Sequence, residues 1–87
     1  MGNGVTPEKA FGEVLKELRN ERKFSQEELA FQAGLERNYI SLLELGKNSA
    51  SIKMLFKLAP KLNVTVSEMM AMVETRMREA DKKPKRA

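Results

Sequence analysis

Two short helical patterns joined by one glycine constrain the fold more than any other feature of this 87-residue sequence. Ser25 and Glu28 form a capping box, and Phe24 and Leu29 occupy the two positions of a hydrophobic staple. These four residues predict that a helix begins after Ser25. Gly34 follows the last apolar position of that helix, where the left-handed conformation that ends a helix is least unfavourable. The first helix is therefore about two turns long.

The second pattern predicts a helix with one apolar and one outward face. Leu35, Ile40 and Leu43 recur at the spacing of one helical face. With 3.6 residues per turn, the opposite face carries Arg37, Asn38, Ser41 and Leu42. This second face is left free to contact another molecule.

Several of these residues repeat a known pattern at matching intervals. They are Gln26-x-x-Leu29-Ala30, the turn at Gly34-Leu35, Tyr39-Ile40-Ser41 and Leu43-Glu44-x-Gly46. From about Phe11 to about Met70 the chain resembles the phage-repressor and Cro-like helix-turn-helix family. The Arg-x-Tyr-Ile-Ser run is similar to that of small stand-alone regulators such as restriction-modification controller proteins. The resemblance implies an all-α, compact five-helix lambda-repressor-like DNA-binding domain, with the helix-turn-helix at its second and third helices.

Helices are also predicted on both sides of the motif. Thr6 and Pro7 suit the N-cap and first position of a helix, and Ser51 suits the N-cap of a fourth helix over about residues 52–62. Pro60 interrupts the fourth pattern, because it lacks the N–H that would bond the carbonyl of Phe56, at a cost of about 3 kcal/mol or more. The helix is either kinked at Pro60 or ends near Ala59. Kinking is favoured because the apolar spacing continues at residue 62.

The fifth predicted helix is longer than a compact five-helix body needs. Thr65 and Glu68 form a second capping box, so the helix begins near Val66 and its apolar stripe runs to about Arg78. Methionine side chains adapt readily to a partner surface. We therefore expect a homodimer contact from Met69, Met70, Val73 and Met77.

The positive charge of the chain is concentrated at its end. The formal net charge is +4, and Lys82, Lys83, Lys85 and Arg86 account for all of it: without them 12 basic residues face 12 acidic ones. The sequence therefore divides into a flexible arm (1–6), a helix-turn-helix domain (7–79) and a disordered basic tail (80–87). DNA binding by the neutral body requires its charges to be sorted onto faces.

Composition argues against catalysis. The chain has no histidine and no cysteine, which removes the usual general base, the commonest metal ligand and any thiolate nucleophile. No cofactor and no small-molecule ligand is evident. Neither a membrane span nor a signal peptide is visible, so we expect a cytoplasmic protein without a membrane partner.

The resemblance and the residue types together assign the site. Arg37 can donate twice to guanine, Asn38 can bond adenine, and Leu42 can touch a thymine methyl group. Residues expected at bases are Arg37, Asn38, Ser41 and Leu42; residues expected at phosphates are Ser25, Gln26, Tyr39, Lys47 and Asn48. The resemblance further implies a structural salt bridge between Arg19 and Glu44. Glu36 departs from the family, which often has a capping Ser or Thr there.

The leading hypothesis is a sequence-specific DNA-binding transcriptional regulator that binds a two-fold symmetric operator in double-stranded DNA as a homodimer. Phage or plasmid repressor, restriction-modification controller and antitoxin all remain open. The alternative is a protein-interaction module that keeps the fold and binds a partner through Leu42, Leu45 and the methionine-rich fifth helix.

Overall fold

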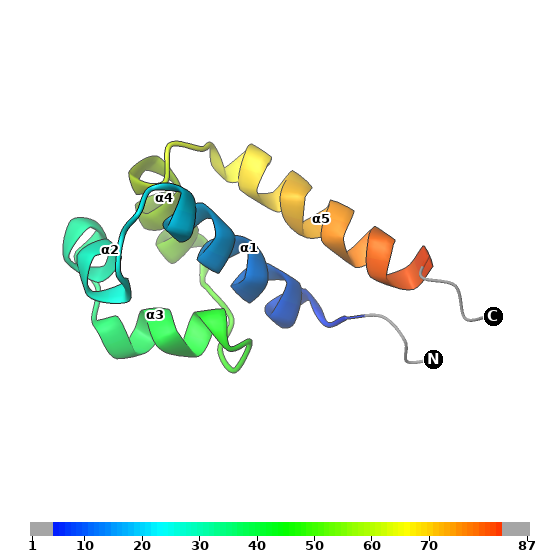
Figure 1. The fold of residues 1–87 in the computed structure, drawn as a ribbon, viewed down its shortest axis with the longest axis horizontal. Helices are drawn as coiled ribbons and strands as arrows, with labels where there is room; N and C mark the ends of the chain where they lie inside the picture. The colour runs from blue at the N-terminus through cyan, green and yellow to red at the C-terminus, as the bar shows by residue number, and fades with distance from the viewer. Residues whose placement is uncertain (1–4, 83–87) are drawn as a thin grey trace.

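The computed structural model describes residues 5–82, which form five helices and, within that range, no strand (Figure 1). The helices are α1 (Pro7–Glu21), α2 (Gln26–Ala33), α3 (Arg37–Glu44), α4 (Ile52–Lys61) and α5 (Val66–Lys82). The predicted all-α, five-helix architecture is confirmed. None of these helices is long and apolar enough to cross a lipid bilayer. Most of the predicted arm and basic tail, residues 1–4 and 83–87, lies outside the described range.

Side-chain caps fix the start of four helices. The hydroxyl oxygen of Ser25 accepts from the backbone N–H of Glu28 at 3.0 Å, which is one of the two bonds of the predicted capping box, while the Glu28 carboxylate accepts from the Gln32 amide at 3.2 Å. Equivalent bonds join Thr6 to Lys9 (3.1 Å), Ser51 to Met54 (3.2 Å) and Thr65 to Glu68 (3.0 Å). The Thr65 box is reciprocal, since a Glu68 carboxylate oxygen accepts from the Thr65 N–H at 2.9 Å. These starts are therefore set by residues local in sequence.

The first four helices end in the same way. A residue with positive φ follows each of them: Lys23 (61°), Gly34 (70°), Gly46 (76°) and Asn63 (62°). After α1, the Phe24 N–H bonds back to the Arg19 carbonyl at 3.1 Å, and after α2 the Leu35 N–H bonds back to the Ala30 carbonyl at 2.8 Å. This is the Schellman arrangement, which satisfies carbonyls that would otherwise be unpaired. It also turns the chain sharply, so that each helix packs on another.

The structure decides between the two predicted ends of α4, and it places the end of α5 later than predicted. α4 continues through Pro60 to Lys61, so an end near Ala59 is wrong. Pro60 is exposed in the last turn, and Leu62 just beyond it is buried in the core, as the apolar spacing predicted. α5 continues to Lys82, past the predicted domain boundary at residue 79.

The core is built around α1, which packs against α3 and against α5, while α2 packs against α3 and α4. In Figure 1, α1 lies between α3 and α5. Fifteen apolar residues form one buried cluster that draws on all five helices. Met69 belongs to this cluster, with 0% of its surface exposed, and Val73 is nearly as buried. The expectation that Met69 contacts a second copy is therefore wrong: its periodicity reflects packing within the chain.

Gly12 allows α1 and α3 to cross unusually closely. A Cβ atom at this position would lie 2.4 Å from the carbonyl oxygen of Leu43 and 2.6 Å from that of Glu44. Both atoms are backbone atoms of α3, so they cannot rotate away as a side chain can. The absence of a side chain at Gly12 thus sets the distance between α1 and α3.

Candidate nucleic-acid interface

The predicted motif is formed by α2 and α3, which pack against each other on one side of the molecule (Figure 1). Gly34 turns the chain between them with a φ of 70°, a conformation that glycine adopts without strain. α3 turns Ile40 and Leu43 inward, and both are fully buried. Arg37 and Asn38, on a different side of α3, are exposed, as a reading helix requires.

The four predicted base-contacting residues lie on this one helix. Arg37 and Asn38 are exposed and form the first turn of α3, while Ser41 and Leu42 follow one turn later and are half-buried. Glu36 is the N-cap of α3 but makes no side-chain cap bond. Arg37 is therefore the first residue of a helix whose N-terminus is not capped by the Glu36 carboxylate.

Four of the predicted phosphate-contacting residues fall into two groups, at the start of α2 and in the loop after α3. Ser25 and Gln26 begin α2, whose first-turn amides carry the positive end of the helix dipole. Lys47 is exposed and Asn48 is half-buried in the loop after α3. Tyr39 packs partly against the core, which leaves only part of its ring accessible. Gln26 bonds Glu44 in the last turn of α3, and Lys47 and Asn48 follow that turn, so both groups lie near the C-terminal end of the reading helix.

A buried ion pair anchors the C-terminal end of α3. Arg19 Nε lies 2.6 Å from Glu44 Oε2, and Arg19 Nη2 donates to Glu44 Oε1 at 2.9 Å. The side chains of Arg19 and Glu44 retain only 10% and 4% of their exposed surface. The third guanidinium nitrogen, Nη1, donates to the Phe24 carbonyl at 2.8 Å. The structure therefore places Arg19 and Glu44 in the salt bridge that the resemblance implied, away from the reading face.

The hydrogen bond to Glu44 raises the pKa of the Arg19 guanidinium above its ordinary value, and this outweighs the opposing effect of burial. Arg19 consequently stays charged in the folded protein at neutral and moderately alkaline pH. A charge-assisted, two-bond pair of this kind also fixes orientation. It joins the end of α1 to the end of α3.

Gln26 is the third member of this network, and the sequence pattern did not reveal it. Its amide Nε2 donates to Glu44 Oε1 at 2.9 Å, so one carboxylate oxygen accepts from both Arg19 and Gln26. A primary amide has two N–H donors. One of them holds the side chain against Glu44, and Gln26 is half-buried.

A helix-turn-helix with an outward reading helix and amide donors beside it defines a DNA-binding domain of the helix-turn-helix class. Comparison with known proteins agrees. The family model described as "Helix-turn-helix" matches residues 15–69. The chain belongs to this helix-turn-helix family.

The chain is similar to several control and controller proteins. The control protein C.MunI from Mycoplasma sp is 42% identical over 65 residues, which span 74% of this chain and 88% of that protein. The crystal structure of the restriction-modification controller protein C.AhdI from Aeromonas hydrophila is 39% identical, with a TM-score of 0.69, over 71% of this chain and 94% of that one. The controller protein C.Esp1396I, solved as a tetramer with its natural 35 base-pair operator, is 27% identical, with a TM-score of 0.76. That match covers 85% of this chain and 97% of the controller.

Proposed function

We propose that this protein is a sequence-specific transcriptional regulator that binds a two-fold symmetric operator as a homodimer, in the manner of a restriction-modification controller. The observation that carries the proposal is the first turn of α3, where the adjacent residues Arg37 and Asn38 are exposed. The opposite side of this helix is anchored by the buried Ile40 and Leu43 and by the Arg19–Glu44 ion pair. The similarity to C.Esp1396I, solved on its operator, supports it.

Base readout is assigned to the outward face of α3. Arg37 donates to guanine O6 and N7, which discriminates by about 1 to 3 kcal/mol against another base. Asn38 bonds adenine, Ser41 donates or accepts at a base edge, and Leu42 contacts a thymine methyl group. All four residues stand on one helix, so a single docking of α3 in the major groove brings them to consecutive bases.

Positioning on the duplex is assigned to residues around α3. Ser25 and Gln26 donate to one phosphate at the start of α2, while Tyr39, Lys47 and Asn48 meet the backbone elsewhere. Such contacts set register and supply affinity that falls with salt, without reading sequence. Glu27 and Glu28 also lie in the first turn of α2, where their carboxylates repel DNA phosphates. Binding at this end of α2 therefore depends on hydrogen bonds from the amides and not on net positive charge.

The experiment that tests the proposal is selection of bound duplexes from a random DNA pool. The wild type is run beside a variant with both Arg37→Ala and Asn38→Ala. We expect a two-fold symmetric consensus with the wild type and no enrichment with the double variant. If a folded wild-type protein enriches no sequence, the proposal fails. The exposed Leu45 would then favour a protein-interaction module.

Arg37→Ala alone is expected to flatten the preference at one base pair of each half-site. The loss is about 1 to 3 kcal/mol, because two hydrogen bonds to guanine disappear. Arg37 is exposed, so fold and dimerisation should be unchanged. Affinities for single-base operator variants, measured by fluorescence anisotropy, check this. Lys53→Ala, an exposed cation on α4, is the matched control and should leave the preference as it is.

Gln26→Ala is expected to weaken binding to every duplex by about tenfold, whatever its sequence. The reason is that the variant loses the amide that Glu44 holds toward the phosphate. The dependence of the binding constant on salt should change little, since Gln26 is neutral. Titration of consensus and scrambled duplexes at two salt concentrations measures both quantities. Gln32→Ala, at an exposed position on the same helix, serves as control. A loss confined to the consensus would make Gln26 a base reader instead.

A further inference from the structure

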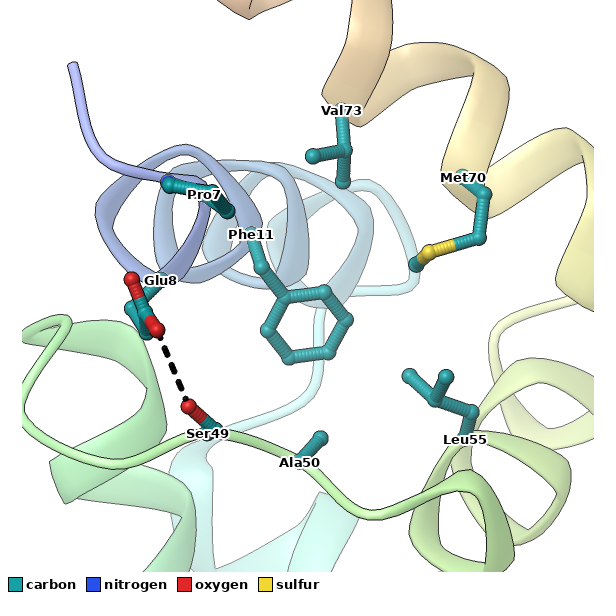
Figure 2. Close-up of a pocket in the computed structure, with 8 residues that line it drawn as sticks. All are labelled: Pro7, Glu8, Phe11, Ser49, Ala50, Leu55, Met70 and Val73. Carbon is teal, nitrogen blue, oxygen red and sulfur yellow. Dashed lines mark hydrogen bonds between the residues drawn. The ribbon is translucent and has the colours of Figure 1, made fainter.

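An apolar pocket opens beside the N-terminal end of α1, away from the predicted base-reading face of α3. Figure 2 shows its lining, which comes from α1, the loop before α4, α4 itself and α5. The apolar lining residues are Pro7, Phe11, Ala50, Leu55, Met70 and Val73. Glu8 and Ser49 close one side, where the Ser49 hydroxyl donates to a Glu8 carboxylate oxygen at 3.2 Å. The two polar side chains thus satisfy each other, and the remaining wall offers only apolar contact.

The size of the pocket suits one aromatic ring. Its volume is about 170 Å³. An apolar cavity of about 150 Å³ is large enough to bind benzene. A phenylalanine side chain supplied from outside would therefore fill it and remove the surfaces of Leu55 and Met70 from water.

The chain itself exposes such a side chain next to a residue that lines the pocket. Among residues 5–82, the exposed aromatic residues are Phe31 (82% exposed) on α2 and Phe56 (63%) on α4. Phe56 directly follows the pocket residue Leu55, whereas α2 contributes nothing to the pocket. Ile52, 73% exposed, precedes Phe56 by one helical turn and extends the same apolar edge.

We propose that Phe56 of one copy inserts into this pocket of a second copy, and that the second copy returns the same contact. A two-fold interface must be self-complementary, so that the projecting group and its receptor lie on one patch. Phe56 and the pocket meet that condition, and Phe31 does not. This inference rests on the proposed function, because it names the partner surface of the proposed homodimer.

The position of the pocket fits a dimer that reads two half-sites. The loop that carries Ser49 and Ala50 connects the end of α3 directly to the start of α4. A two-fold axis near this loop would place the two α3 helices on either side of it, as binding to a symmetric operator requires. Of the residues predicted to form the dimer contact on α5, Met70 and Val73 line the pocket. The expected contact therefore shifts from the whole of α5 to the pocket that α5 shares with α4 and α1.

Phe56→Ala is expected to raise the dimer dissociation constant at least about 30-fold, because an aromatic anchor in a pocket carries a large share of the binding energy. Analytical ultracentrifugation of the full chain measures it. Phe31→Ala removes an even more exposed ring from α2 and should leave the constant unchanged. Since Phe56 lies on the surface, circular dichroism should show both variants folded. An unchanged constant for Phe56→Ala overturns the inference.

The sequence contains no cysteine, which permits a direct test of proximity. Phe56→Cys protein is mixed with Ala50→Cys protein and oxidised, so that a disulfide between the two variants must join different chains. The two proteins are mixed in equal amounts, and random pairing would give twice as much of the mixed species as of each like-paired species. We expect an excess of the mixed species well beyond twofold, as judged by mass; a 1:2:1 mixture contradicts the assignment. The random-pool selection separates the two proposals. If the wild type enriches an operator but its dimer is insensitive to Phe56→Ala, only the proposed pocket contact is rejected. If the dimer depends on Phe56 but no DNA sequence is enriched, only the proposed function as a regulator is rejected.

Discussion

Glu44→Ala is expected to lower the free energy of unfolding by about 3 to 5 kcal/mol, the usual consequence of leaving a buried charge without its partner. The variant keeps the Arg19 guanidinium in a site where only 10% of the side chain is exposed, with one remaining acceptor, the Phe24 carbonyl. Gln26 loses its acceptor as well. Urea denaturation followed by circular dichroism measures the change. The Glu44 carboxylate joins the end of α3 to the end of α1 through Arg19 and to the start of α2 through Gln26.

The matched control is Glu36→Ala. This glutamate is also at an end of α3, but it is exposed and makes no cap bond, so the change should be within about 0.5 kcal/mol. The stability that Arg19 contributes has a defined dependence on pH. Because its pKa is raised by folding, the contribution is fully present below the pKa of the unfolded chain and is lost only in strong alkali. A loss of less than about 1 kcal/mol in Glu44→Ala would show that water reaches Arg19 in the variant.

Gly12→Ala should be the other strongly destabilising substitution, with a loss of about 3 kcal/mol or more. In an ordinary helix interior alanine would be favoured over glycine by about 1 kcal/mol. Here the added Cβ would lie within 2.6 Å of two carbonyl oxygens of α3, so the clash determines the sign. α3 must move away from α1, and operator affinity should fall together with stability.

Lys16→Ala is the control for Gly12→Ala, since Lys16 lies on the exposed side of the same helix. Its midpoint of thermal unfolding should change by no more than a few degrees, while that of Gly12→Ala should fall well below the wild-type value. A more stable Gly12→Ala protein would mean that α1 and α3 are farther apart than described.

The features that the sequence predicted well are those decided by neighbouring residues. The helix starts at Ser25, Ser51 and Thr65 depend on a hydroxyl and an N–H three residues apart, and each was formed as expected. The turn at Gly34 depends on one residue that tolerates positive φ. The helix-turn-helix is dense in such local signals, which is why its position was found from the chain alone.

What could not be predicted depends on residues far apart in the chain. Gly12 matters because of the backbone at Leu43 and Glu44, and nothing near residue 12 indicates that approach. Met69 and Met70 are adjacent residues of the same type, and the sequence pattern assigned both to the apolar stripe of the fifth helix. Only the packed structure shows that the first is buried and the second lines a pocket. Periodicity identifies an apolar face without identifying what covers it.

Phe11 and Gly12 are adjacent in α1, yet the first lines the pocket beside α5 and the second touches the backbone of α3. One rigid helix therefore lies between the proposed partner contact and the helix that reads bases. In a dimer built this way, the separation of the two reading helices is fixed by packing, with no flexible linker to adjust it. Each base pair inserted between half-sites rotates one of them by about 35° around the DNA axis. The dimer would thus select operators by the spacing of their half-sites as well as by their base sequence.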